Sequence, residues 1–253
     1  MAKRGGDTYF PVMKKMKFLK RILIWLLRFR KRRGYGVHSP FAFNLITGVF
    51  YEKAPYYDYD YLRKVVSKTR KKSKTHWKRY LENYRVYELL FRLANYAEAN
   101  TILEIGTSIG VSSIYLSCSR KNARLVTLDE KSKTNEMALS LFKNYSSKVD
   151  FRAGIVSDML PQAIDELETI DFLLFHPRSY TLDSIHQMFE MCLEKSNSQS
   201  VFVIQDIYSS HAIKNWWNEL VSDERVGITF DLYDMGIIFF DKKKIKQHYR
   251  VNF

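Results

Sequence analysis

The stretch Thr101-Ile-Leu-Glu-Ile-Gly-Thr-Ser-Ile-Gly-Val-Ser-Ser113 predicts a strand, a tight turn and a helix. Its apolar run, 102–105, is too short for a helix, and apolar residues return at helical spacing after Gly110. Gly106 and Gly110 mark the turn, because glycine lets the backbone approach a ligand closely. The unpaired N–H groups of the following helix would face that ligand. The stretch therefore predicts a ligand site at the end of a strand.

The spacing of this turn narrows the class of ligand. Glu104 ends the strand and the glycines follow as Glu-x-Gly-x-x-x-Gly, which is neither the dinucleotide fingerprint nor a P-loop. A second short apolar run, 124–128, ends in Asp129. A mononucleotide-binding fold places a carboxylate on ribose hydroxyls about twenty residues after its glycine turn. The two acids therefore predict a ligand with a ribose and little phosphate.

The segment Leu103-Glu104-Ile-Gly106-Thr-Ser-Ile-Gly110, followed by Asp129, resembles the first two motifs of the class I S-adenosylmethionine-dependent methyltransferases. With Ser112 opening the helix, it is most similar to the catechol-type O-methyltransferases. The resemblance runs from about Ala94 to the C-terminus and implies S-adenosylmethionine as the cofactor. It implies that the glycine turn faces the methionine part, that Ser112 holds its carboxylate and that Asp129 holds the ribose. The cofactor-binding residues implied in this way are Glu104, Gly106, Thr107, Ser108, Gly110, Ser112, Asp129, Glu130, Gly154 and Ile155.

Gly154-Ile155 follows the third expected strand, where the family contacts the adenine through a Gly-Asp/Asn step. Gly154 matches that step, and Ile155 replaces its polar residue, so an apolar contact with the adenine face is expected. A second similarity lies near the N-terminus. Gly-Val-His38-Ser-Pro-Phe is similar to a segment of Bacteroidetes-type class I methyltransferases of unassigned substrate, and His38 is therefore expected on the substrate side.

From Thr101 onward, predicted strands alternate with predicted helices, which is typical of a parallel sheet covered on both faces. The segment 226–240 instead holds two strands and a short turn. We expect a Rossmann-like α/β fold with a seven-stranded methyltransferase sheet, an antiparallel C-terminal hairpin and a helical N-terminal extension. The extension would span 1–95 and the methyltransferase domain 96–253. Strands are expected at about 101–105, 124–128, 149–152, 170–175 and 200–205, and helices at about 111–120, 132–144, 158–167, 180–194 and 210–221.

The chain carries a formal net charge of +14, which favours an acidic partner: nucleic acid, an anionic membrane or a phosphorylated small molecule. The basic segment 16–33 has an apolar run, 22–27, too short to cross a hydrocarbon core of about 30 Å. Such a helix either lies on an anionic membrane surface or docks on its own domain. The run 67–79, with seven Lys/Arg, is a solvated face or, with Trp77, a nucleic-acid contact.

The two cysteines, Cys118 and Cys192, lie in apolar helical contexts. This pattern suits reduced thiols in a cytosolic protein rather than a disulfide framework or a metal cluster. We therefore expect a cytoplasmic protein, with peripheral membrane association through 16–33 as the alternative.

The expected chemistry lies beyond the carboxyl ends of the strands. The catechol-type branch holds a divalent cation with an Asp after the fourth strand and an acidic pair after the fifth, where this sequence has His176 and Gln205-Asp206. Because hard cations prefer several oxygen ligands, this set disfavours a divalent metal, and we expect none. His176 is instead predicted to act as a general base with Asp206 orienting it, and Arg178 and Tyr208 are predicted to contact the acceptor.

These residues predict an S-adenosylmethionine-dependent methyltransferase with a small-molecule acceptor. The resemblance to catechol-type O-methyltransferases implies that the methyl group is transferred to an oxygen. One alternative is a degenerate methyltransferase fold acting as a binding module, because carboxylates are missing at His176 and Gln205. Another is an RNA methyltransferase, which the charge of +14 favours. The sequence has no Asn-Pro-Pro-Tyr/Phe motif, which is typical of enzymes that methylate a base amine. Its absence disfavours the RNA methyltransferase.

Overall fold

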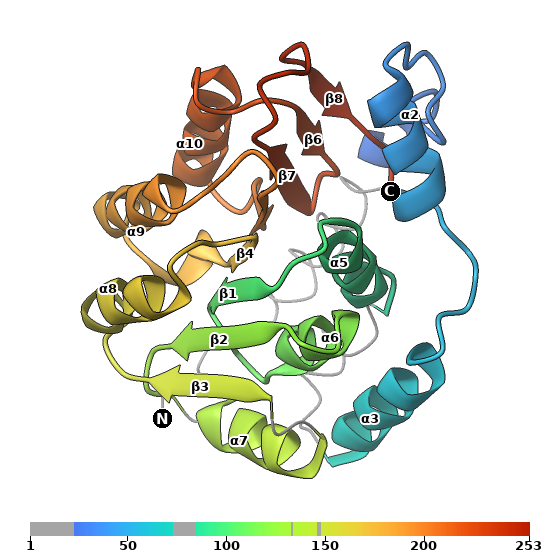
Figure 1. The fold of residues 1–253 in the computed structure, drawn as a ribbon. Coiled ribbons are helices and arrows are strands. Elements are labelled where there is room, and N and C mark those ends of the chain that lie inside the picture. Colours follow the sequence, from blue (N-terminus) through green and yellow to red (C-terminus); the bar gives the residue numbers. More distant parts are fainter. Residues whose placement is uncertain (1–22, 73–83, 133, 146–147) are drawn as a thin grey trace, which may run out of the picture.

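The computed structural model describes residues 23–72, 84–132, 134–145 and 148–253. Within these residues an eight-stranded sheet has the order β3-β2-β1-β4-β5-β7-β6-β8 (Figure 1). Its strands are β1 (Thr101–Ile105), β2 (Arg124–Asp129), β3 (Val149–Ala153), β4 (Phe172–Phe175), β5 (Val201–Gln205), β6 (Thr229–Asp231), β7 (Met235–Phe239) and β8 (His248–Arg250).

The sheet is parallel from β3 to β5, and β7 lies antiparallel between β5 and β6. The predicted Rossmann-like sheet with a closing antiparallel hairpin is therefore confirmed. The prediction of seven strands was wrong, because β8 pairs in parallel with β6 and adds an eighth. This strand has three residues and lies at the sheet edge. It lacks the apolar run by which the buried strands are recognised.

The helices of the sheet domain alternate with the strands, as predicted. They are α5 (Tyr84–Tyr96), α6 (Val111–Ser119), α7 (Thr134–Tyr145), α8 (Val156–Leu167), α9 (Leu182–Glu194) and α10 (His211–Ser222), with a short 3₁₀ turn, η2 (Pro177–Ser179), before α9. Before them come α2 (Pro40–Leu45), the π-helical turn η1 (Ile46–Phe50) and α3 (Tyr59–Lys72). The Ser39 hydroxyl caps α2 by accepting from the Ala42 N–H, and Pro40 is the first residue of the helix.

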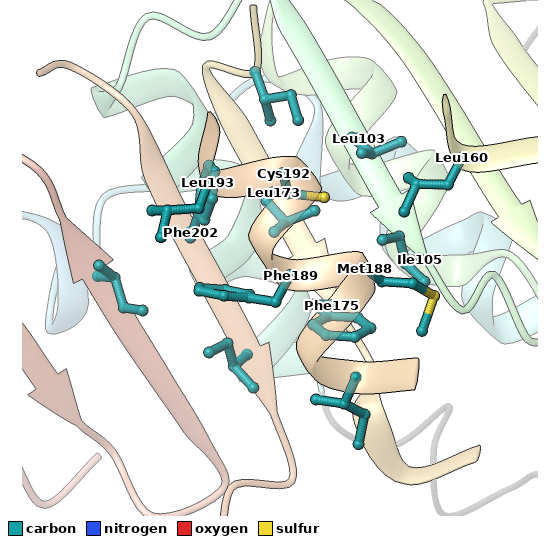
Figure 2. Close-up of a cluster of buried hydrophobic side chains, with 14 of the residues drawn as sticks. Leu103, Ile105, Leu160, Leu173, Phe175, Met188, Phe189, Cys192, Leu193 and Phe202 are labelled. Atoms are coloured by element: carbon teal, nitrogen blue, oxygen red, sulfur yellow. The ribbon is translucent and has the colours of Figure 1, made fainter. Parts of the chain in front are cut away.

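Alternate residues of each central strand enter different cores. On one face, Leu103, Ile105 and Phe175 pack with α8, α9 and α10, and Figure 2 shows Phe175 near Met188 and Phe189 of α9. On the other face, neighbouring strand residues pack with α2, η1 and α5. The extension before α5 therefore shares a core with the sheet, and this leaves the carboxyl edge of the strands to the loops.

Arg28 ties the basic N-terminal segment to the sheet. Residues 23–27 are helical, and the Arg28 Nη1 and Nη2 atoms donate to Asp231 Oδ1 and Oδ2, each at 2.9 Å. Nearby, Leu27 is 74% and Trp25 44% exposed. The described part of the segment thus contacts its own domain and also exposes apolar side chains. Residues 16–22 and most of the basic run, 73–79, lie outside the described residues.

Where side chains and backbone are described, no helix has the length and apolar character needed to span a membrane.

Candidate functional site

The turn after β1 is built around Gly106. Its N–H donates to the Leu128 carbonyl at 2.8 Å, so the turn continues the pairing of β1 with β2. Its φ is +100°, and a Cβ placed here would lie 2.8 Å from the Cβ of His176. A side chain is therefore excluded by both conformation and space. Gly110, with φ +80°, ends the turn and precedes α6.

Asp129 closes β2 at the same edge of the sheet. One carboxylate oxygen accepts from the Ser108 N–H at 2.9 Å and from Asn135 Nδ2 at 3.3 Å, and the other accepts from the Glu130 N–H at 3.1 Å. The side chain is partly exposed, and desolvation raises the pKa of Asp129 to about 6. Through Ser108 the carboxylate is fastened to the glycine turn.

The end of β3 lies beside these residues. The Gly154 N–H donates to the Asp129 carbonyl at 3.0 Å, and the Val156 N–H lies 3.5 Å from Glu130 Oε1. Ile155 between them is 60% exposed and can therefore contact a ligand at this edge. The structure thus brings together the turn, Asp129, Glu130 and the Gly154–Ile155 step that the sequence placed on separate strands.

Glu104 lies beneath the turn and is fully buried. It accepts hydrogen bonds from the hydroxyls of Ser112 (2.5 Å), Thr127 (2.7 Å) and Ser113. Burial raises the pKa of Glu104 to about 7 despite these donors. A serine hydroxyl has one hydrogen, so Ser112 cannot donate to a ligand carboxylate while it donates to Glu104. Thr107 also turns inward, 2.6 Å from Thr127 Oγ1.

His176 follows β4 and lies against the turn. Its backbone N–H donates to the Ile105 carbonyl at 2.9 Å, and its side chain is 27% exposed. The Nε2 atom is buried without a hydrogen-bond partner and lies 4.0 Å from Glu104 Oε1, which is too long for a hydrogen bond. Desolvation lowers the pKa of His176 to about 4. The ring is therefore neutral at physiological pH and has an unused nitrogen at the predicted reaction site.

Gln205 is the last residue of β5, and Asp206 follows it. Asp206 has φ +55°, and its N–H donates to the Asp234 carbonyl at 2.7 Å. It forms no hydrogen bond with Nε2 of His176, because that atom has no partner. In the described part of the chain, no group of three or more His, Cys, Asp or Glu side chains could hold a metal ion. His176, Gln205 and a single Asp do not fit the oxygen-rich ligand set of Mg²⁺.

Two of the predicted acceptor residues lie at the carboxyl edge. Arg178 is part of η2, and Tyr208, after β5, donates its hydroxyl to Asp231 at 2.6 Å. An open pocket of about 170 Å³ lies between the β4–α9 and β5–α10 connections; its lining residues are Arg178, Tyr180, Leu182, Ile185, Ser209, Ser210, Ala212 and Ile213.

His38 is exposed in the segment before α2. Phe41, at the start of that helix, packs on Phe239, which pairs with the first residue of β5. This contact lies at the amino end of the strands, whereas the glycine turn lies at the carboxyl end. The substrate role of His38 therefore remains a prediction.

The sequence analysis did not predict several residues that lie near the site. Asn135 donates to Asp129, and burial, followed by the charges of Asp129 and Glu130, raises the pKa of the Tyr180 hydroxyl. The hydroxyls of Thr127 and Ser113 donate hydrogen bonds to the Glu104 carboxylate. Thr127 alternates with apolar residues in a strand, a polar break in a buried run that could have indicated a buried partner.

Comparisons with known proteins identify the architecture. No family model matches the chain. A catechol O-methyltransferase from Niastella koreensis is 36% identical over 77 residues, which are 29% of this chain and 35% of that protein. The chain thus spans about a third of the length of this curated relative.

Solved structures match over more of the chain. A SAH-bound methyltransferase from Podospora anserina has a TM-score of 0.60 and 15% identity, covering 80% of this chain and 96% of its own. The O-methyltransferase TomG from Streptomyces achromogenes, in complex with SAM, has a TM-score of 0.55 and 22% identity, covering 70% and 89%. The O-methyltransferase from Bacillus cereus, in complex with SAH, has a TM-score of 0.54 and 20% identity, covering 76% and 95%. The strand order, the glycine turn and these neighbours together show that the chain has the class I methyltransferase fold.

Proposed function

We propose that this chain is an S-adenosylmethionine-dependent methyltransferase that methylates an oxygen of a small-molecule acceptor. One observation carries the proposal: the Gly106 turn and the Asp129 carboxylate are joined at the carboxyl edge of the sheet by the Ser108 N–H. In open α/β sheets this edge binds ligands. The similarity to O-methyltransferases supports oxygen as the atom that receives the methyl group.

The residues present fit the cofactor. Gly106 has a φ of +100°, a conformation that favours glycine, and its turn lies at the carboxyl edge of the sheet, where a ligand would bind. Asp129 is partly exposed and can accept from ribose hydroxyls, and exposed Ile155 can cover an adenine face. The His176 ring lies against the turn, and its Nε2 atom is buried without a hydrogen-bond partner. With Ser112 donating to Glu104, the methionine carboxylate would depend on backbone N–H groups of the turn and α6.

When bound, the cofactor supplies an electrophilic methyl group on a sulfonium. The chain has to hold the acceptor in line with that group and exclude water. His176 is neutral at physiological pH and follows β4 beside the glycine turn, so we assign it the role of accepting the hydroxyl proton of the acceptor. With a pKa of about 4 it is a weak base, so we attribute most of the rate to positioning. Asp206 would then act on the acceptor side rather than as the partner of Nε2.

A divalent metal has no part in this mechanism. The donor set at the family's metal positions has one carboxylate, from Asp206, with Gln205 and His176 beside it. The chemistry of this set does not suit a hard cation.

The test of the function is transfer of label from methyl-labelled S-adenosylmethionine into fractionated cell extract. We expect labelled, base-stable small molecules, and reduced labelling with His176→Gln. Cofactor binding without any transfer would instead support a binding module. Label in the RNA fraction would support an RNA methyltransferase, an alternative with no described feature in its favour beyond the positive charge.

We also propose an anionic membrane surface as a partner of the N-terminal segment. Leu23, Leu26 and Leu27 are more than half exposed, and 30–33 is an unbroken run of Arg and Lys. Exposed leucines beside cations suit an interfacial helix. Cosedimentation with phosphatidylglycerol vesicles should be weakened by Leu27→Ser, and no binding to such vesicles would contradict the proposal.

We retain two further predictions as proposals. The first is the division into an N-terminal extension, 1–95, that covers one sheet face and a methyltransferase domain, 96–253. The second is a cytoplasmic location, for which the free thiols of Cys118 and Cys192 are the support.

A further inference from the structure

The pocket between the β4–α9 and β5–α10 connections has two kinds of wall. Ile185 and Ile213 are buried residues of the core and form an apolar floor, while Arg178, Ser209 and Ser210 are exposed at its polar rim. A volume of about 170 Å³ is small, so it suits a single ring or a short chain rather than a large ligand. The walls therefore suit a small molecule that is apolar at one end and polar at the other.

Arg178 differs from the other arginines of the sheet domain. The arginines at 120, 124, 152, 225 and 250 each lie within 4.0 Å of a carboxylate. Among the residues that the structure describes, no acidic side chain forms an ion pair with Arg178. A guanidinium presents a planar set of donors that matches a carboxylate or a phosphate in two-point contact. Arg178 therefore offers an unused anion-binding group on the pocket wall.

The pocket also lies beside the candidate cofactor site. Arg178 is two residues beyond His176, and Ser209 is three residues beyond Asp206. Tyr180, four residues beyond His176, also lines the pocket. Because β4 is the neighbour of β1 in the sheet, the loop with Arg178 adjoins the glycine turn.

We propose that this pocket binds the acceptor, and that the acceptor is a small hydroxylated molecule with an anionic group, a carboxylate or a phosphate, that pairs with Arg178. The apolar part of the acceptor packs on Ile185 and Ile213 and its hydroxyl faces His176. The assignment of the ligand as acceptor rests on the proposed function. The assignment of an anion-binding pocket stands on the pocket and on Arg178 alone.

Calorimetric titration of the full chain tests this proposal with three probes that share one ring: 4-hydroxybenzoate, phenyl phosphate and phenol. We expect at least one anion to bind about tenfold more tightly than phenol, since a hydrogen bond to a charged group has this magnitude. Arg178→Gln should remove the difference, and Arg178→Lys should restore part of it. Arg120→Gln removes the same charge from the C-cap of α6 and should change the affinity less than about twofold. The stronger anion identifies the group as carboxylate or phosphate.

Equal binding of phenol and both anions, the absence of anion binding, or an unchanged affinity in Arg178→Gln would overturn the proposal. A parallel titration with S-adenosylhomocysteine separates it from the proposed function. Arg178→Gln should bind S-adenosylhomocysteine as the wild type does. If the wild type binds an anion through Arg178 but does not bind S-adenosylhomocysteine, the anion pocket stands and the methyltransferase function fails.

Discussion

Replacing Arg28 by Ala should destabilise the fold far more than replacing an exposed arginine. Asp231 has a side chain that is 1% exposed, and that of Arg28 is 12% exposed. The guanidinium makes a two-point contact with the carboxylate and lies 5.9 Å and 5.6 Å from the ring centres of Tyr208 and Tyr233. The pair of Arg28 and Asp231 joins residues 203 positions apart in the sequence.

The loss of stability in Arg28→Ala depends on the hydrogen bonds that Asp231 retains. Removing one partner of a buried ion pair costs about 3–5 kcal/mol, because the other charge stays buried. Here the Tyr208 hydroxyl (2.6 Å) and the Tyr233 N–H (2.8 Å) still donate to Asp231, so we expect the lower end, about 3 kcal/mol. The pKa of Asp231 is lowered in the fold by its donors, so this stability is present above the unfolded value and is lost as pH falls through the folded value.

Urea unfolding at neutral pH, followed by circular dichroism, measures the effect. The matched control is Arg225→Ala, because Arg225 also contacts two carboxylates but is 50% exposed, and its loss should cost less than about 1 kcal/mol. Combining Arg28→Ala with Asp231→Asn should cost less than the sum of the single changes, by at least about 1 kcal/mol. A loss below about 0.5 kcal/mol for Arg28→Ala would refute the reasoning.

Three further predictions concern the turn. Gly106→Ala should cost about 2 kcal/mol in urea unfolding, because its φ of +100° and the 2.8 Å approach to His176 leave no room for a methyl group, and an unchanged midpoint would contradict this. The pKa of His176 lies below its unfolded value, so the stability of the wild type relative to His176→Gln should fall as pH drops from about 6.5 to 4, and an NMR titration midpoint near 6.5 would contradict the burial argument. The pKa of Glu104 is raised to about 7, so the wild type should lose stability relative to Glu104→Gln as pH rises from about 4.5 to 7, and a flat difference in urea midpoints would show that the carboxylate is not desolvated.

The sequence predicted the central sheet because its strands are short apolar runs with acids and glycines at their ends. The turn after β1 and the position of Asp129 follow from that pattern alone. The strand β8 could not be found in this way, since its three residues pair at an edge and have no apolar run. Edge pairing depends on the tertiary position of β6, which local sequence does not encode.

In the candidate site, too, some features could be predicted from the sequence and others could not. Backbone positions such as Gly106 were predictable because a left-handed conformation needs glycine. Side-chain directions were not predictable. The inward turn of Ser112 toward Glu104 and the pair between Arg28 and Asp231 arise from three-dimensional contacts between elements far apart in the chain or on opposite sides of a turn.

Calorimetric titration with S-adenosylhomocysteine tests the central claim most directly, with wild type, Asp129→Ala and Asp165→Ala compared. Asp165 is 77% exposed on α8 and serves as the control for the loss of a carboxylate. We predict binding by the wild type and by Asp165→Ala, and a loss of at least about tenfold for Asp129→Ala with its unfolding transition still cooperative. No binding by the wild type, or equal binding by Asp129→Ala, would contradict the assignment of this edge of the sheet as the cofactor site.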